Sequence, residues 1–185
     1  MRLKNTFNIK KMIKSLKKYN PNFSHKPINR SKIRIFIGKL VFTWHRYYIW
    51  LFCKNVVFAI TMKKESFEYE VAKHQTPLFR QLRNVDMWLQ KNKVNNLKLA
   101  TEKVNGLILK PGETFSFWKL IGKPTRRKGY VEGMVLVNGS FHPGIGGGLC
   151  QLSNLIYWMT LHTPLMVTER WRHNYDVFPD SNRQQ

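Results

Sequence analysis

This chain of 185 residues is poor in acidic residues and in cysteine. It contains 10 Asp and Glu against 32 Lys and Arg, which gives a formal net charge of +22. Two cysteines cannot build the disulfide framework of a small secreted domain, so Cys150 is treated as a free thiol and the compartment stays open. Cys53 lies in an aromatic-rich segment, which indicates a packing role.

Motifs for metals and nucleotide cofactors are also missing. Zinc sites use short-spaced ligand pairs such as Cys-x-x-Cys or His-Glu-x-x-His, and no such pair occurs among His142, Cys150, His162 and His173. The glycine run at residues 144–148 is followed by Leu-Cys, where a phosphate-binding loop needs Lys-Ser or Lys-Thr. We therefore expect neither a metal nor another cofactor.

The basic charge is concentrated at the N-terminus. Residues 1–64 contain sixteen Lys and Arg, and the first acidic residue is Glu65. So high a density of positive charge attracts polyanions, and we therefore expect an anionic membrane surface or a cell-envelope polymer as partner. Nucleic acid is the less favoured partner, because no RNA-binding sheet or helix-turn-helix signature is evident. A solvated lysine face without a partner is the alternative.

No apolar run is long enough to span a membrane. The aromatic and aliphatic stretch Ile33–Ile60 is broken by charged or histidine side chains before about 18 apolar residues accumulate, at Lys39, His45, Arg46 and Lys54. It is predicted to form an amphipathic or buried helix, and Phe7–Tyr19 a basic amphipathic helix. Without a recognisable secretory signal, we expect a cytoplasmic chain or one peripheral to a membrane.

One cysteine lies where a glycine loop opens a helix. Gly146, Gly147 and Gly148 directly precede Leu149-Cys150, and apolar residues then recur every three or four positions until Pro164. Because amides at a helix N-terminus favour a thiolate, Cys150 is the best candidate nucleophile. A small buried cysteine packed in the core is the competing interpretation.

The turn-forming residues and the apolar periodicity predict an α+β fold: a small mixed domain with a glycine loop leading into the Cys150 helix. The predicted regions are a basic, mainly helical segment at 1–62, an amphipathic connecting segment at 63–93 and the compact domain at 94–185. Within that domain we expect a helix capped by Asn95 or Asn96, strands at Thr114–Trp118 and Val131–Val137, a hairpin turn at Asn138-Gly139, and an extended segment from Leu165 to Phe178.

A cysteine nucleophile needs a base and donors for an oxyanion. His173 is the predicted base, and Gln151 or the loop amides are the predicted oxyanion donors. Candidates to orient the base are Glu169, Asn174 and Asp176. The predicted binding residues are Gly146, Gly147, Gly148, Ser153, Arg126, Arg127 and Arg170, the arginines because guanidinium groups recognise carboxylate or phosphate. A structural histidine and an exposed basic loop are the competing interpretations.

Several separated motifs resemble one bacterial family. They are Asn96-Leu-Lys-Leu-Ala100, Gly106-Leu-Ile-Leu-Lys-Pro-Gly-Glu-Thr-Phe-Ser-Phe-Trp118, Gly129-Tyr130, Gly146-Gly-Gly-Leu-Cys-Gln-Leu-Ser-Asn154 and Glu169-Arg170 with His173. Their order and spacing are similar to those of the VanW family. The resemblance implies a role in glycopeptide (vancomycin) resistance or other cell-envelope processes, but it supplies no reaction. The family continues beyond the position that matches Phe178-Pro179, so we expect a truncated domain with an unpaired sheet edge.

Three functional hypotheses follow. In the first, Cys150 and His173 act on peptidoglycan or a precursor; in the second, the chain binds such material without catalysis; in the third, the basic N-terminus binds nucleic acid. The resemblance ranks the third last. The substrate and the oligomeric state are left open by the sequence.

Overall fold

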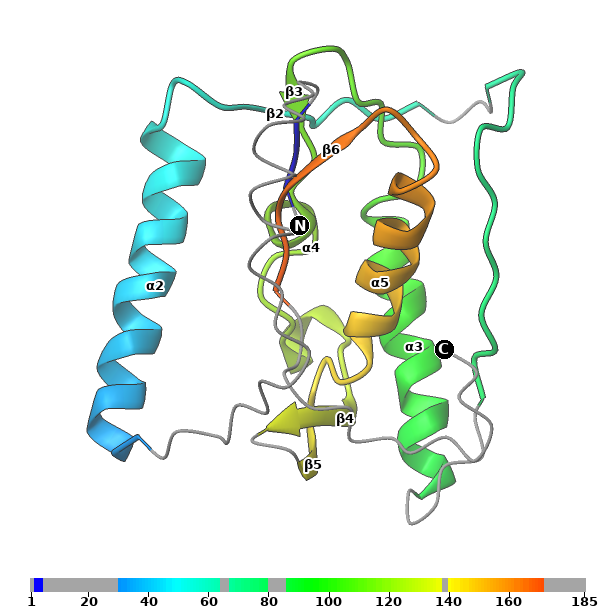
Figure 1. Cartoon of the computed structure of the whole chain (residues 1–185). Coiled ribbons are helices and arrows are strands. Elements are labelled where there is room, and N and C mark those ends of the chain that lie inside the picture. Colours follow the sequence, from blue (N-terminus) through cyan, green and yellow to red (C-terminus); the bar gives the residue numbers. More distant parts are fainter. Residues whose placement is uncertain (1, 5–29, 64–66, 80–85, 138–139, 172–185) are drawn as a thin grey trace, which may run out of the picture.

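The computed structural model describes residues 2–4, 30–63, 67–79, 86–137 and 140–171, and it has the predicted α+β architecture. Helices and strands are interspersed along the chain (Figure 1). The elements are β1 (Arg2–Lys4), α2 (Lys32–Phe52), β2 (Val57–Phe58), α3 (Met87–Glu102), β3 (Glu113–Thr114), α4 (Phe117–Ile121), the 3-10 turn η1 (Arg126–Lys128), β4 (Glu132–Val137), β5 (Ser140–Ile145), α5 (Leu149–Thr160) and β6 (Met166–Glu169).

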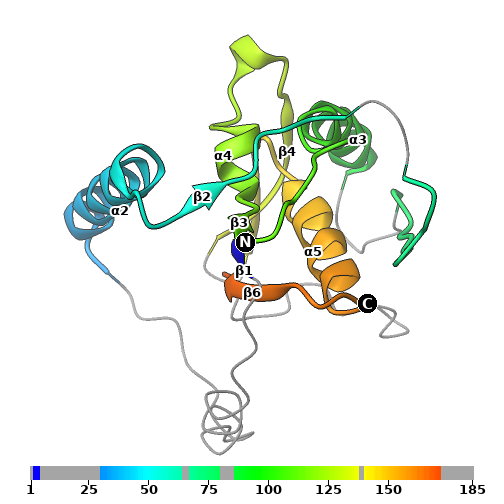
Figure 2. The ribbon, with the colours of Figure 1, turned by 90° about the horizontal axis from the view of Figure 1, so that it is seen from above.

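Helix α2 confirms the prediction of a helix within the stretch 33–60. It begins after Ser31, whose hydroxyl accepts a hydrogen bond from the Arg34 amide at 3.3 Å. None of its 21 residues is buried, and it stands to one side of the other elements in both views (Figures 1 and 2). Within the described part of the chain, no helix has both the length and the apolar character to cross a membrane. The predicted helix at Phe7–Tyr19 lies outside the described residues.

The described strands pair in twos. Strand β4 and strand β5 are antiparallel with Val137 opposite Ser140, which confirms the predicted hairpin, although Asn138-Gly139 itself lies outside the described residues. Strand β1 pairs antiparallel with β6, so the start of the chain lies beside residues 166–169. Strand β2 pairs parallel with β3 and ties the end of α2 to the compact part.

The core lies where α3, α4 and α5 meet the start of β4. Its buried apolar residues are Ala100, Phe115, Phe117, Ile121, Tyr130 and Leu149. Half-buried side chains from α5 and β6, including Leu152, Ile156 and Val167, pack against this cluster. Helix α5 confirms the predicted periodicity after the glycine loop: its inward residues recur every three or four positions.

Helix α3 begins earlier than predicted, at Met87 rather than after Asn95 or Asn96. Asp86 occupies the N-cap position, and Asn96 lies in the middle of the helix with none of its surface exposed. The cap prediction was wrong because the asparagines pair with another segment instead: Asn96 faces the start of β4 and the glycine loop. The helix therefore runs through position 94, where the compact domain was predicted to begin.

The strand predicted at Thr114–Trp118 is also wrong beyond its first residue. Strand β3 ends at Thr114, and the backbone turns into helix α4 from Phe117 onward. The carbonyl of Ser116 accepts hydrogen bonds from the amides of Lys119 and Leu120, at 3.1 and 3.2 Å. The short helix buries Phe117 in the core and leaves Trp118 exposed. The aromatic residues favoured a strand in the sequence, but packing against the core determines their conformation instead.

Candidate functional site

The glycine loop is built by close packing against the chain's own backbone. Gly146 and Gly148 have φ of 75° and 91°, values that favour glycine. A Cβ on Gly147 would lie 2.1 Å from the carbonyl carbon of Gly133 in β4, and one on Gly148 would lie 2.2 Å from Cγ of Lys93. The loop thus admits the neighbouring backbone of β4.

A buried amide locks this arrangement. Nδ2 of Asn96 donates to the carbonyls of Val131 and Gly147, both at 3.0 Å, and Oδ1 accepts from the Val131 amide at 2.9 Å. The amide of Gly146 donates in turn to the Val131 carbonyl at 3.0 Å. One side chain on α3 therefore fixes both the start of β4 and the loop that leads into α5.

Cys150 lies in the first turn of α5 and is exposed to solvent. Desolvation by the surrounding protein nevertheless raises the pKa of its thiol, while backbone hydrogen bonds and the charge of Lys93 lower it by less. Cys150 is thus accessible to water on one side, while the protein packed around its other sides disfavours the charged thiolate. A reagent in solution can approach the residue from the accessible side. The thiol form is favoured, contrary to the expectation from the helix N-terminus.

The predicted partners of Cys150 are not brought together by the described residues. His173, Asn174 and Asp176 lie outside them. The side-chain amide of Gln151 donates to Oγ1 of Thr76 and to the carbonyl of Pro77, both at 3.0 Å, and so fastens the segment 67–79 to α5. Gln151 is therefore occupied in this structure, and its role as an oxyanion donor stays a prediction.

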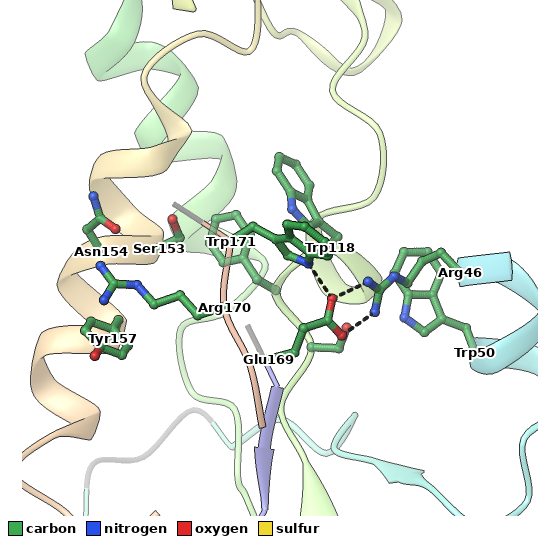
Figure 3. A pocket seen from close by; sticks show the side chains of 11 residues that line it. Arg46, Trp50, Trp118, Ser153, Asn154, Tyr157, Glu169, Arg170 and Trp171 are labelled. Atoms are coloured by element: carbon green, nitrogen blue, oxygen red, sulfur yellow. Dashed lines mark hydrogen bonds and ion pairs between the residues drawn. The ribbon is translucent and has the colours of Figure 1, made fainter. Parts of the chain in front are cut away.

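A pocket opens beside the same face of α5. Ser153, Asn154 and Tyr157 line it, and they follow Cys150 at spacings of three, four and seven, so all four residues lie on one side of the helix. The cavity has a volume of about 100 Å³. Its other lining residues come from α2, α4 and β6 and the positions next to them (Figure 3): Arg46, Trp50, Ser116, Phe117, Trp118, Glu169, Arg170 and Trp171.

An ion pair closes one side of the pocket. Nη1 of Arg46 donates to Oε2 of Glu169 at 2.9 Å, its Nη2 pairs with Oε1, and Nε1 of Trp171 donates to Oε1 at 2.8 Å (Figure 3). The hydrogen bonds from Arg46 are the largest cause that lowers the pKa of Glu169 to about 2. The same bonds raise the pKa of Arg46. The pair joins α2 to β6 across 123 positions of sequence.

The predicted binding arginines fall in two places. Arg170 lines the pocket with its guanidinium carbon 3.5 Å from the centroid of the Tyr157 ring, and it forms no ion pair with another described residue. Arg126 lies on η1 and pairs with Glu132 at 2.5 Å, in a more open hollow beside Trp88, and Arg127 is exposed on the same turn. The structure thus brings Ser153 and Arg170 to the pocket and places the other two arginines elsewhere.

Sequence reasoning missed the aromatic lining and the ion pair. Trp50, Trp118 and Trp171 come from three distant segments, and Arg46 was noted only because it interrupts an apolar stretch. Only Trp118 carried a local signal, as the last residue of a family-like motif. No group of three metal-ligating side chains forms among the described residues; His142 is exposed on β5 and His162 is exposed in the turn after α5.

The ion pair makes a testable contribution to stability. The pKa of Glu169 is about 2 in the folded chain and about 4.3 in an unfolded one, so the contribution is complete above about pH 4.3 and is lost as the pH falls towards 2. We expect Glu169→Gln to lower the free energy of unfolding by about 1 kcal/mol at pH 6, since the pair is partly solvated.

Urea unfolding of both proteins between pH 6 and pH 3 measures this difference, which should shrink as the pH falls. Glu132→Gln is the matched control, because its pair with Arg126 is more exposed and should contribute little. A difference that stays constant down to pH 3, or an equal effect of both substitutions, would contradict the assignment.

Comparisons with known proteins show which family the sequence resembles. Residues 92–183 match the family model described as VanW like protein. The chain is 41% identical over 125 residues to the Vancomycin B-type resistance protein VanW of Enterococcus faecalis, covering 68% of this chain and 46% of that protein. It is 32% identical over 87 residues to the Uncharacterized protein YoaR of Bacillus subtilis, covering 47% of this chain and 29% of that one.

The chain therefore spans less than half the length of these curated relatives. No solved structure matches it significantly. The matched region contains α4, the glycine loop, Cys150 and the β6 side of the pocket. On the strength of the family model and the similarity to the Enterococcus protein, the chain belongs to the VanW family.

Proposed function

We propose that the chain is an accessory protein of glycopeptide resistance or a related cell-envelope process, and that it binds a peptidoglycan fragment in the pocket beside Cys150. The name of the Enterococcus relative supports the process. The single observation that carries the binding site is the composition of the pocket, which is lined by three tryptophans and by Arg170, whose guanidinium stacks on the Tyr157 ring.

Peptidoglycan offers the chemistry that this lining recognises. Aromatic rings with polar edges pack against the apolar faces of sugar rings, and a guanidinium binds the carboxylates of the lactyl and peptide groups. The indole N–H of Trp50 is buried and has no hydrogen-bond partner among the described residues, so an acceptor on the ligand would satisfy it. A cavity of about 100 Å³ holds only part of a ligand, which favours a segment of polymer over a complete small molecule.

Tryptophan fluorescence tests this proposal, because three of the six tryptophans line the pocket. A soluble disaccharide-peptide fragment of peptidoglycan should change the emission and saturate. We expect Arg170→Ala to weaken binding about tenfold or more, since a charge-assisted hydrogen bond contributes about 1.5–3 kcal/mol.

The matched control is Arg127→Ala, which removes an exposed arginine outside the pocket. It should leave the affinity within about twofold of the native value, a change of less than about 0.5 kcal/mol. An absence of saturable binding would remove the proposal, and so would equal losses in the two variants, because attraction to the overall positive charge would then explain them.

Catalysis by Cys150 is the second candidate, and the position of the thiol favours it. Cys150 is exposed on the helix face that lines the pocket, so a ligand held there lies along the same side of α5. In this candidate His173 takes the thiol proton, and Gln151 would leave Thr76 and Pro77 to receive an oxyanion. The raised pKa of the thiol makes such a base necessary.

Alkylation rates against pH separate catalysis from binding alone. In a Cys53→Ser background Cys150 is the sole thiol, and desolvation predicts a rate that keeps rising above pH 9. We expect this profile, with little effect of His173→Ala, if the chain only binds. A plateau below about pH 8 that disappears in His173→Ala would instead establish an activated nucleophile.

A further inference from the structure

Helix α2 presents an apolar stripe to solvent. Its members recur every three or four residues, which places them on one face of the helix. They are Ile33, Phe36, Ile37, Leu40, Val41, Trp44, Tyr47, Tyr48 and Leu51, and each is between 46% and 75% exposed. A helix of 21 residues with so wide an apolar face and no buried residue needs an apolar environment that the described part of the chain does not supply.

The stripe faces away from the compact part of the molecule. Helix α2 contacts that part through Arg46, which pairs with Glu169, and through the carbonyl of Trp50, which accepts a hydrogen bond from Nζ of Lys119 at 3.1 Å. At about 100° per residue, Arg46 and Trp50 lie roughly 100° or more from the centre of the stripe. Figure 2 shows the other labelled elements on one side of α2.

Basic residues border the stripe on both edges. Lys32 and Lys39 lie seven residues apart along one edge, and Arg34 lies on the other. Helix α2 has no acidic residue, and none precedes Glu65 in the chain. Long basic side chains beside an apolar face can extend to lipid phosphates while their stems stay in apolar surroundings.

We propose that α2 lies in the plane of an anionic membrane surface, with the stripe among the acyl chains and the basic edges at the level of the phosphates. Charge complementarity selects this occupant over an uncharged apolar groove, because the basic residues on both edges would meet anionic headgroups. The helix is not long and apolar enough to cross a membrane, which leaves the surface orientation. The pocket lies on the face of α2 that carries Arg46, away from the stripe. The membrane proposal is therefore independent of the ligand proposed for the pocket.

Vesicle flotation of the full chain tests the proposal. We expect binding to vesicles of phosphatidylcholine with phosphatidylglycerol, and weaker binding to phosphatidylcholine alone. Trp44→Asp places a charge in the stripe and should weaken binding to the mixed vesicles at least tenfold. The matched control is Phe42→Asp, because Phe42 is an aromatic residue of similar exposure, 70% against 75%, on the opposite side of the helix.

The control should change binding by less than about threefold, and circular dichroism should show the same helix content in both variants. Equal losses in the two variants would overturn the proposal, because the basic N-terminal region would then explain binding by charge alone. An absence of binding to the mixed vesicles would also overturn it. So would a dimer in sedimentation that Trp44→Asp dissociates, since a second copy would then cover the stripe.

Discussion

The fully buried side chain of Asn96 is the interaction on which the site depends. It satisfies the amide and carbonyl of Val131 and the carbonyl of Gly147 from one position on α3. These backbone groups lie where β4 and the glycine loop approach so closely that no side chain fits between Gly133 and Gly147. Loss of the amide would leave buried polar groups unpaired at this crossing, which is costly in a dry interior.

The position of α5 follows from that crossing and determines which residues can act together. The loop delivers Leu149 to the core and leaves the next residue, Cys150, exposed on an adjacent side of the same turn. The pocket face of α5 lies beside the end of β6, where Arg170 stacks on Tyr157. The carboxylate of Glu169 there binds Arg46 and so joins β6 to α2. One glycine loop thus orders a core face and a pocket face on one short helix.

Local patterns predicted the elements whose residues also pack locally. The periodicity after Leu149 and the turn signal between β4 and β5 sufficed for α5 and the hairpin. The pattern failed where a partner lies far along the chain: Asn96 was read as a cap, although its partners are 35 and 51 positions away. The pair of Arg46 with Glu169 spans 123 positions, so no local signal predicts this ion pair.

Urea unfolding of two neighbouring asparagine variants tests the central claim most directly. Asn96→Ala removes three hydrogen bonds made by a fully buried side chain, and we expect it to lower the free energy of unfolding by about 2–4 kcal/mol. Asn95→Ala removes one exposed hydrogen bond, to the carbonyl of Gly129 at 3.1 Å, and should lower it by less than about 1 kcal/mol. Equal losses in the two variants would contradict the claim that Asn96 holds the glycine loop in place.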